Sequence, residues 1–510
     1  MFKNKQLLVL SLLALIFIFG FWLRYKNIEG YNIIIDYDQI EDQFYTYTIA
    51  VDHKLAIIGR AIYGDPRLHH GIFYYYYNFI PFLLSSGSFL TSVYWNSFFN
   101  TATAVILFIL AKLMFKKILP AFLTAIIVAS SFEFIKFSNW LTIDTAAIFL
   151  VPLFFLGLWN YFQSRQWGLI LTAISLGLSI QTDLSFLYLI LILVIYWIIF
   201  RPKIPNSKTL LLSILGFLIT ISTLILTEIK LNFAGVKMLL NFANTLEAAK
   251  LSYKLRFELF FKDFLANFTN NLIPQNSQLG IFLAVLVIGI VLYHLSSKKT
   301  SKIEKSGIYF LLLYLFAPAV TLLFGYHNKP WFLIGLPPAI VLATGYAISK
   351  LNFYLIIPII FLIIGSNTSM ILQRPNESYK LFNDIYDSTS YLKFQLQVVD
   401  YTYQQSKGQQ FAINAVTYPL YYNGLWAYLY NWYGKKTYHY LPEWLGGDQI
   451  HPYDLLSKAN QEKIFYMIIS ETPRIPDIYK NKGRIWAMER VKLIEEKKFT
   501  AFTVLKMEKK

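Results

Sequence analysis

The sequence predicts an all-α polytopic membrane domain of about 11 transmembrane helices, followed by a small C-terminal α/β soluble domain. Two observations support this fold class. Mean hydropathy is +0.46, and hydrophobic residues make up 56% of the 510-residue chain, well above an ordinary soluble protein. Apolar runs of 17 to 21 residues also recur along the chain, and about 20 helical residues cross a bilayer core.

The predicted spans follow the apolar runs in chain order. They are residues 7–23, 89–113, 118–134, 143–161, 167–181, 184–200, 209–229, 279–295, 308–324, 331–348 and 353–372. The first run could also be a signal peptide, because Lys3 and Lys5 precede it. It is long for that role, and no small-x-small cleavage site follows, so a retained first span is expected.

Basic residues predict the orientation of these spans. With the N-terminus in the cytoplasm, the cytoplasmic segments hold 14 Lys and Arg residues, whereas the three short outer loops hold two. The positive-inside rule then orients the protein with three large segments outside. The membrane is expected to be the cytoplasmic (plasma) membrane. These segments are residues 24–88, residues 230–278 and the tail 373–510.

The tail differs in composition from the membrane domain, which is predicted to cover residues 1–372. It contains short strand-like runs such as "KIFYMIIS" and "FTAFTVLKM", separated by Gly and Pro at "YGKK", "WLGGD" and "ETPRIP". Residues 373–510 are therefore predicted to form a small extracytoplasmic α/β domain. No internal repeat is visible in the sequence.

Composition also excludes several classes of function. The chain has no cysteine, which rules out disulfides, thiolate catalysis and sulfur-ligated metals. It has no Walker loop, no G-x-G-x-x-G and no G-x-S-x-G motif, so nucleotide-driven chemistry and hydrolase elbows lack support. The net charge of +17 falls largely in short loops, where it indicates topology and not nucleic-acid binding.

The stretch "DYDQIED" at residues 36–42 places four carboxylates in seven positions just after the first span. In a helix, Asp38, Glu41 and Asp42 share one face, because they are three or four residues apart. Like charges at this spacing raise one another's pKa, which suits a general base near neutral pH. The alternative is an acidic face in water, or one paired with Lys54, Arg60 and Arg67.

Other ionisable residues gather at the predicted outer ends of the spans. They are Glu133, Lys136, Asp144, Asp183, Glu228, His327 and Lys329. Charges near a bilayer are costly and often functional, so with the first-loop acids they predict a polar cavity at the outer leaflet. The alternative is that span ends are simply polar.

The first loop continues with "GRAIYGDPRLHHGIFYYYYNFIPFLL". A phosphate could be held here by basic side chains, namely Arg60, Arg67, His69 and His70. The tyrosines that begin with Tyr74 and Tyr75 suit the headgroup region, as an aromatic belt or as cover for a charged lipid headgroup.

No metal or other cofactor is expected from the sequence. His69 and His70 are adjacent and cannot easily face one ion from a regular element, and His53 has no partner pattern. No H-E-x-x-H or comparable ligand spacing occurs.

Several motifs together resemble the GT-C superfamily of membrane glycosyltransferases, in particular the bacterial branch of the dolichyl-phosphate-mannose–protein mannosyltransferase family (glycosyltransferase family 39), akin to aminoarabinose transferases. A first-loop D-Q-x-x-D matches Asp38, Gln39 and Asp42. "HGIFYYY" is similar to the family's H-G-P-L-Y-Y-Y, with Ile72 replacing proline. "GLSIQTDLSF" resembles a family turn in which histidine is common at the place of Asp183. "YHNKPWFLIGLPPAI", which contains His327, resembles a later family segment, and Asp144 stands near an acidic position of some relatives.

The resemblance implies transfer of a sugar, with inversion, from a polyprenyl-phosphate carrier to a hydroxyl of a protein, lipid or glycan on the outer face. It implies a first-loop base, here Asp38 with support from Asp42 or Glu41. Basic residues would meet the departing phosphate, and members of this branch are mostly metal-independent. The residues implied in donor-phosphate or substrate binding are Arg60, Arg67, His69, His70, Tyr74, Tyr75, Asp144, His327 and Lys329.

Three other functions remain open at this point. A transporter or flippase of lipid-linked sugars would require charges or broken helices near mid-bilayer and paired halves, which the sequence does not show. A surface polysaccharide ligase or polymerase would use an oligosaccharide on a pyrophosphate. A structural module with a partner-binding tail would leave the acid cluster unexplained.

Overall fold

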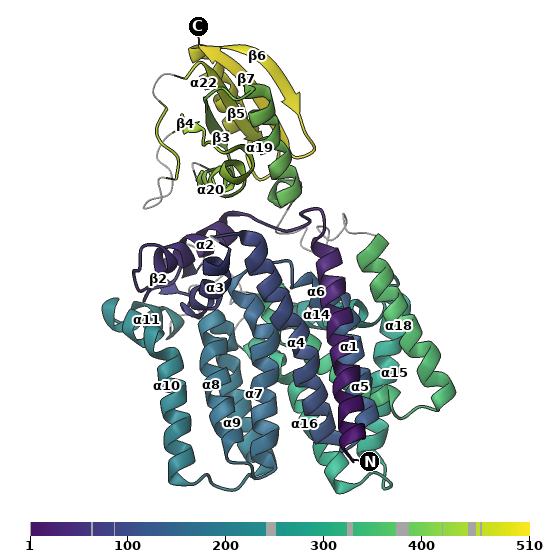
Figure 1. Cartoon of the computed structure of the whole chain (residues 1–510). Coiled ribbons are helices and arrows are strands. Elements are labelled where there is room, and N and C mark those ends of the chain that lie inside the picture. Colours follow the sequence, from purple (N-terminus) through teal and green to yellow (C-terminus); the bar gives the residue numbers. More distant parts are fainter. Residues whose placement is uncertain are drawn as a thin grey trace.

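The computed structural model describes residues 2–62, 65–85, 87–240, 251–323, 330–373, 387–420, 422–446, 455–459 and 462–509. A bundle of helices forms the larger part, and a C-terminal α/β region sits on one end of it (Figure 1). The N-terminus lies at the opposite end of the bundle. We call the end that carries the α/β region the domain end. The predicted fold class is confirmed.

Seven helices among the described residues are long and apolar enough to cross a membrane. Four shorter apolar helices accompany them, and all eleven correspond in order to the predicted spans. The helices that form these eleven segments are α1 (Phe2–Ile28), α4 (Phe89–Phe115), α5 (Ile118–Ser130), α7 (Ala147–Phe162), α8 (Trp167–Thr182), α9 (Tyr188–Phe200), α10 (Ser207–Lys230), α15 (Ser277–Ser296), α16 (Lys302–Phe316), α17 (Leu336–Ile348) and α18 (Phe353–Gln373). The chain is a multi-pass membrane protein.

Some predicted spans are shorter as helices than as apolar runs. Helix α17 has 13 residues, a length of about 20 Å against a hydrocarbon core of about 30 Å. Every residue of α17 is buried, so neighbouring helices and not lipid surround it. Short 3₁₀ segments replace helix at two such places, η1 (Ile143–Ala146) and η2 (Leu184–Leu187).

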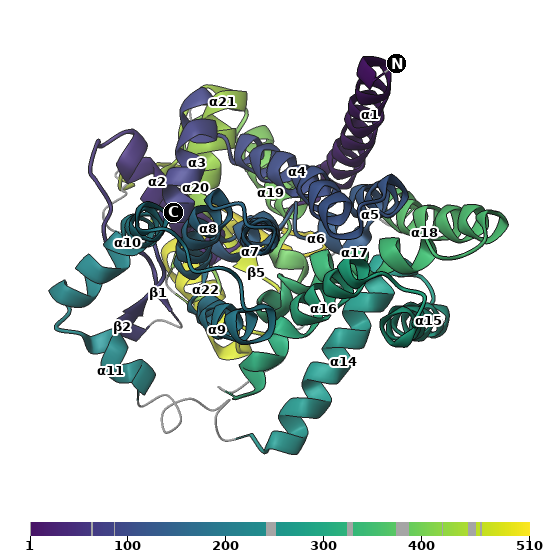
Figure 2. The same cartoon turned by 90° about the horizontal axis from the view of Figure 1, so that it is seen from below.

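Close backbone contacts hold the bundle together. A Cβ added to Gly157 of α7 would lie 2.7 Å from the carbonyl oxygen of Gly168 in α8. The contact between α7 and α8 therefore requires glycine at this position. Small residues at helix contacts are typical of membrane bundles, in which packing replaces the hydrophobic effect. Figure 2 shows the bundle from below, where α5 and α17, which are far apart in the sequence, lie side by side.

The segments predicted to lie outside the membrane contain further elements, which lie toward the domain end (Figure 1). The first loop folds into α2 (Tyr37–Ala50), β1 (Ala61–Ile62), β2 (Asp65–His69) and α3 (Phe73–Leu84). Later elements at this end are α6 (Phe132–Lys136), α11 (Ala234–Leu240) and α14 (Tyr253–Leu272). The short η3 (Ala317–Leu323) ends the span that begins with α16, and η4 (Pro330–Leu333) precedes α17.

The C-terminal region contains a five-stranded mixed sheet with the order β4-β3-β5-β7-β6. Its elements are η6 (Ser388–Ser390), α19 (Leu392–Ser406), β3 (Phe411–Val416), α20 (Gly424–Leu429), η7 (Tyr430–Gly434), α21 (Lys435–Tyr438), β4 (Glu443–Trp444), β5 (Ile464–Ser470), α22 (Asp477–Arg490), β6 (Val491–Lys498) and β7 (Phe502–Lys509). Strand β5 is buried along its whole length, as its unbroken apolar sequence requires for a central strand covered on both faces.

The sheet region is joined to the start of the first loop by backbone hydrogen bonds. The N–H of Ile35 donates to Ser390 O (2.8 Å), and the N–H of Leu392 donates to Ile33 O (3.0 Å). The side chain of Gln395 also donates to Ile35 O (2.9 Å). We call this junction the docking seam. It places the C-terminal region directly beside the N-terminus of α2.

Candidate functional site

The four carboxylates of residues 36–42 have two different roles in the structure. Asp36 is the N-cap of α2, and Gln39 completes a capping box with it. Asp36 also accepts a hydrogen bond from Ser390 (2.8 Å) and lies 3.6 Å from Arg474, both in the C-terminal region. It is therefore a structural residue of the docking seam. The other three acids lie on one face of α2, as predicted.

This face of α2 is occupied by one arginine. Arg60 forms an ion pair with Asp38, and its Nε lies 3.5 Å from Asp42 Oδ1 and 4.0 Å from Glu41 Oε2. We call Asp38, Glu41, Asp42 and Arg60 the acid–arginine cluster. Pairing with Arg60 was one of the alternatives left open by the sequence, and Arg60 relieves the repulsion expected between the three carboxylates.

The three carboxylates differ in exposure. The Asp42 side chain is 1% exposed and that of Asp38 is 42% exposed. Burial raises the pKa of Asp42 to about 8, although Arg60 opposes the shift. Burial likewise raises the pKa of Glu41. Asp42 is therefore largely protonated at neutral pH, and Asp38 is the carboxylate of this cluster that a substrate can reach.

Helix α3 supplies a tyrosine layer behind this cluster. Tyr74 and Tyr75 are fully buried, so they do not form a belt against lipid headgroups. The Tyr75 hydroxyl accepts a hydrogen bond from the Arg60 backbone N–H (3.1 Å), and its ring stacks on Tyr45 at 4.6 Å. Tyr74 interacts electrostatically with both Asp42 and Asp144. It thereby connects the acid–arginine cluster to a second group of residues.

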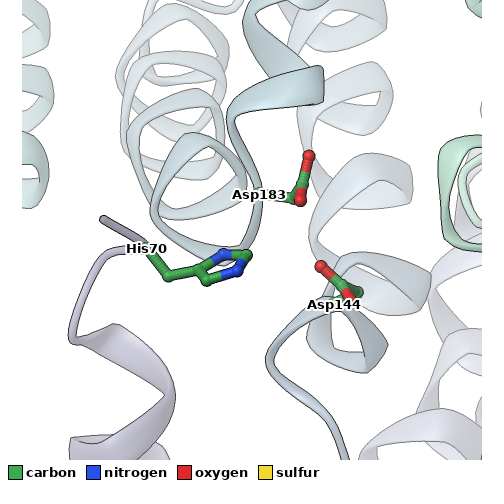
Figure 3. Close-up of side chains that lie close together, drawn as sticks. All are labelled: His70, Asp144 and Asp183. Carbon is green, nitrogen blue, oxygen red and sulfur yellow. The ribbon is translucent and has the colours of Figure 1, made fainter. Parts of the chain in front are cut away.

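That second group consists of His70, Asp144 and Asp183, whose potential ligand atoms all lie within 4.8 Å of one another. Figure 3 shows the three side chains converging from separate segments. His70 follows β2, Asp144 belongs to η1, and Asp183 lies between α8 and η2. We call them the histidine–aspartate cluster. Sequence reasoning named all three residues but did not bring them together, because their contact depends on the tertiary fold.

The segment that carries His70 is anchored to the α8–η2 turn. The Gly71 N–H donates to Gln181 O (3.0 Å), and the Ile72 N–H donates to Gln181 Oε1 (2.8 Å). A Cβ on Gly71 would lie 2.6 Å from Gln181 O, so only glycine permits this approach. These contacts fix the distance between His70 and Asp183, two residues after Gln181.

Other predicted site residues lie elsewhere. Arg67 is 58% exposed and pairs with Asp65 at 2.6 Å. The His69 ring nitrogens lie 2.8 and 3.0 Å from carbonyl oxygens of Gly59 and Pro66, where they support the β1–β2 hairpin. Neither side chain belongs to either cluster. His327 and Lys329 lie outside the described residues.

The remaining acids at span ends also have local partners. Glu133 forms a buried ion pair with Lys136 at 2.7 Å and accepts a hydrogen bond from Asn270 (2.9 Å). Glu228 accepts a hydrogen bond from the Val236 N–H (3.0 Å) beside α11. The predicted outer polar cavity therefore does not include these two acids, because protein groups already satisfy them.

One buried charge was missed by sequence reasoning. Arg24 of α1 is fully buried. It donates to Asn100 Oδ1 at 2.7 and 2.9 Å and to backbone carbonyls of α1 and α5. These bonds tie α1 to α4 and α5, which gives Arg24 a structural role. Arg24 directly follows the apolar run 7–23, and a charge in this position could have indicated a buried partner.

Comparison with known proteins places the fold. No protein-family model and no curated protein matches the sequence. Among solved structures, ArnT from Cupriavidus metallidurans bound to undecaprenyl phosphate superposes with a TM-score of 0.61 at 9% identity, over 98% of this chain and 97% of that chain. The apo state of the same protein gives 0.58 at 10% identity, over 99% and 98%. The predicted GT-C fold is confirmed by this match, which covers 98% of the chain.

Proposed function

We propose that this GT-C-fold protein is an integral membrane glycosyltransferase that moves a sugar from a polyprenyl-phosphate carrier to an acceptor hydroxyl, with inversion. The observation that carries the proposal is the position of Asp38, a half-exposed carboxylate held by buried Arg60 at the domain end of the membrane bundle. The likeness to ArnT bound to undecaprenyl phosphate supports a lipid-phosphate donor. The distribution of Lys and Arg supports an outward-facing domain end.

The location suits such a donor. A polyprenyl tail stays in the bilayer, so the reacting sugar phosphate must lie where the helices end. The acceptor oxygen attacks the anomeric carbon as the bond from that carbon to the phosphate oxygen breaks. The acceptor proton moves to the Asp38 carboxylate, and polyprenyl phosphate leaves with the bonding electron pair. Attack opposite the leaving group inverts the anomeric centre.

The neighbours of Asp38 have supporting roles in this proposal. Arg60 orients Asp38 through their ion pair. Asp42, protonated at neutral pH, and Glu41 hold Arg60 in place. Contact of His327 and Lys329 with the donor phosphate stays a prediction.

The test is transfer by purified protein in lipid nanodiscs, measured as release of free polyprenyl phosphate from polyprenyl-phosphate sugars. Asp38→Asn should lower the rate about 10²- to 10⁴-fold, the usual contribution of a general base. Asp52→Asn is the matched control, because Asp52 is exposed just beyond the same helix. Unchanged transfer by Asp38→Asn would contradict the assignment of the base.

A second donor separates the proposal from ligase chemistry. An oligosaccharide on polyprenyl pyrophosphate should not be consumed at a comparable rate. Consumption of that donor alone would replace the proposed function with ligase or polymerase activity. Movement of labelled lipid across the membrane without release of polyprenyl phosphate would indicate a flippase.

A further inference from the structure

The histidine–aspartate cluster has the composition of a cation site. One imidazole nitrogen and two carboxylate oxygens lie within 4.8 Å of one another, and the three side chains lie close together (Figure 3). All three residues are half-buried, so the cluster is neither sealed in the core nor spread over the surface. A set of one imidazole and two carboxylates suits first-row divalent metals such as Mn²⁺ and Zn²⁺.

Two atoms in the cluster have no partner within the described structure. His70 Nδ1 and Asp144 Oδ1 are inaccessible to solvent and make no hydrogen bond. Buried polar atoms are nearly always satisfied, and an orphan atom indicates a missing water, ion or ligand. The unpartnered Nδ1 atom is therefore the atom that His70 can offer to a metal.

The position of His70 is fixed from outside the cluster. The His70 ring hydrogen-bonds to the backbone of Thr182. The backbone N–H of His70 donates to the Arg60 backbone carbonyl (2.9 Å). Histidine ligands of metals usually have such a second partner, which sets the tautomer and the ring orientation. The anchor between Gly71 and Gln181 described above holds the same segment.

The two carboxyl groups need a positive partner. The ligand atoms of Asp144 and Asp183 lie within 4.8 Å of each other, and two carboxylates this close repel each other unless a proton or a cation compensates them. Arg60 does not fill this role, because it already contacts three carboxylates of the acid–arginine cluster. The choice is therefore between one shared proton and one bound cation.

Charge balance across the two clusters favours a cation. Together they contain five carboxyl groups; with Asp42 protonated at neutral pH, four carboxyl groups remain against one guanidinium. Asp144 interacts electrostatically with Arg60, Asp42 and Asp38, so the clusters share one polar region. An anionic sugar phosphate would be repelled by such a region. A divalent cation would offset the excess negative charge and attract the phosphate.

We propose that His70, Asp144 and Asp183 bind one divalent metal ion beside the acid–arginine cluster. The sequence alone favoured a metal-free protein, since the three ligands lie in separate segments without a recognisable spacing. The role of the ion rests on the proposed function: it stabilises the phosphate oxygen that gains negative charge as the glycosidic bond breaks. The binding itself does not depend on that function.

The test measures binding of Mn²⁺ to purified full-length protein freed of metal by chelator. Free Mn²⁺ gives a sharp electron paramagnetic resonance signal that disappears on binding. One ion should bind per chain, and Asp183→Asn and Asp144→Asn should each weaken binding at least about tenfold. Zn²⁺ should displace Mn²⁺ at lower concentration, following the usual order of metal affinities.

The controls distinguish this cluster from unspecific binding. Asp52→Asn and His53→Asn remove an exposed acid and an exposed histidine from the same loop and should leave Mn²⁺ affinity unchanged. Thermal unfolding confirms that the isosteric cluster variants fold. Equal affinity in wild type and both cluster variants, or no binding of Mn²⁺ or Zn²⁺ at millimolar concentration, would overturn the proposal and leave a shared proton in its place.

Transfer assays separate failure of this inference from failure of the proposed function. Stoichiometric Mn²⁺ binding that requires Asp144 and Asp183 supports the site even if no sugar is transferred. Full transfer in chelator by a protein that binds no metal overturns the metal site and leaves the glycosyltransferase proposal intact.

Discussion

Two groups of ionisable residues near the domain end of the bundle differ in how their charges are satisfied. Glu133 and Lys136 form a pair of opposite charge, which Asn270 completes. In the histidine–aspartate cluster, two carboxyls face each other and an imidazole, and ligand atoms are left without partners. A charged residue at a span end thus indicates a ligand only when protein groups do not already balance it.

The largest expected effect is on the satisfied pair. Lys136→Met leaves Glu133 buried without its cation, which should cost about 3–5 kcal/mol of unfolding free energy. Sugar transfer per folded molecule should stay unchanged, because the pair lies outside both clusters. Thermal and denaturant unfolding in nanodiscs measure the first quantity, and the polyprenyl-phosphate assay measures the second.

A double variant sharpens this result. Glu133→Gln combined with Lys136→Met removes both charges and should recover most of the lost stability. If the double variant is as unstable as Lys136→Met, packing and not charge pairing explains the loss, and the comparison between the two groups fails.

The second effect is a change in the pH dependence of stability. The pKa of Asp42 is raised in the folded protein to about 8, against about 3.9 in an unfolded chain. The folded state therefore binds the extra proton between these values, and stability decreases as pH rises from about 4 to 8. Asp42→Asn should remove this part of the slope in melting temperature between pH 5 and 9.

The matched control for this measurement is Asp52→Asn, whose carboxylate is exposed. Its melting temperature should follow the wild-type pH profile. A wild-type slope in Asp42→Asn would show that Asp42 is ionised in the folded state and that Arg60 outweighs the effect of burial.

The smallest effect should have the opposite sign to that of Lys136→Met. Burial raises the pKa of Asp183, so its ionisation costs stability when no cation is bound. In chelator near pH 8, Asp183→Asn should therefore raise the melting temperature, by less than Lys136→Met lowers it. The amide oxygen can still accept the Ser185 N–H, which bonds Asp183 at 2.6 Å.

Added Mn²⁺ should reverse this difference, because only the wild-type site binds it with all three ligands. The measurement is melting temperature with and without Mn²⁺ for both proteins. If Asp183→Asn instead lowers the melting temperature in chelator, protein groups already satisfy Asp183, as they satisfy Glu133.

The fold was predictable because it rests on long apolar runs, and each of the eleven runs corresponds to a helical segment. The face shared by Asp38, Glu41 and Asp42 was predictable because helix periodicity is local. Its partner was one of several candidates, and only the folded loop selects Arg60. The lengths of the short helices were not predictable, since 3₁₀ segments and proline decide where a buried helix begins.

The site was less predictable where distant segments meet. His70 and Asp183 are 113 positions apart in the sequence, and they meet because Gly71 packs on Gln181. Asp36 belongs to the same acidic stretch as Asp38, yet it caps α2 and holds the docking seam. The four acids are neighbours in the sequence. In the structure Asp36 caps α2, whereas Asp38, Glu41 and Asp42 lie on one face of that helix.

The docking seam gives the C-terminal region a mechanical link to the proposed base. Asp36 begins the helix that presents Asp38, and the same carboxylate holds Ser390 and faces Arg474. A hinge motion that lifts the sheet away would pull on the first turn of that helix. A displacement of the tail by an acceptor would therefore reach the residue proposed to receive the acceptor's proton, through Asp36 and the neighbouring backbone hydrogen bonds of the docking seam.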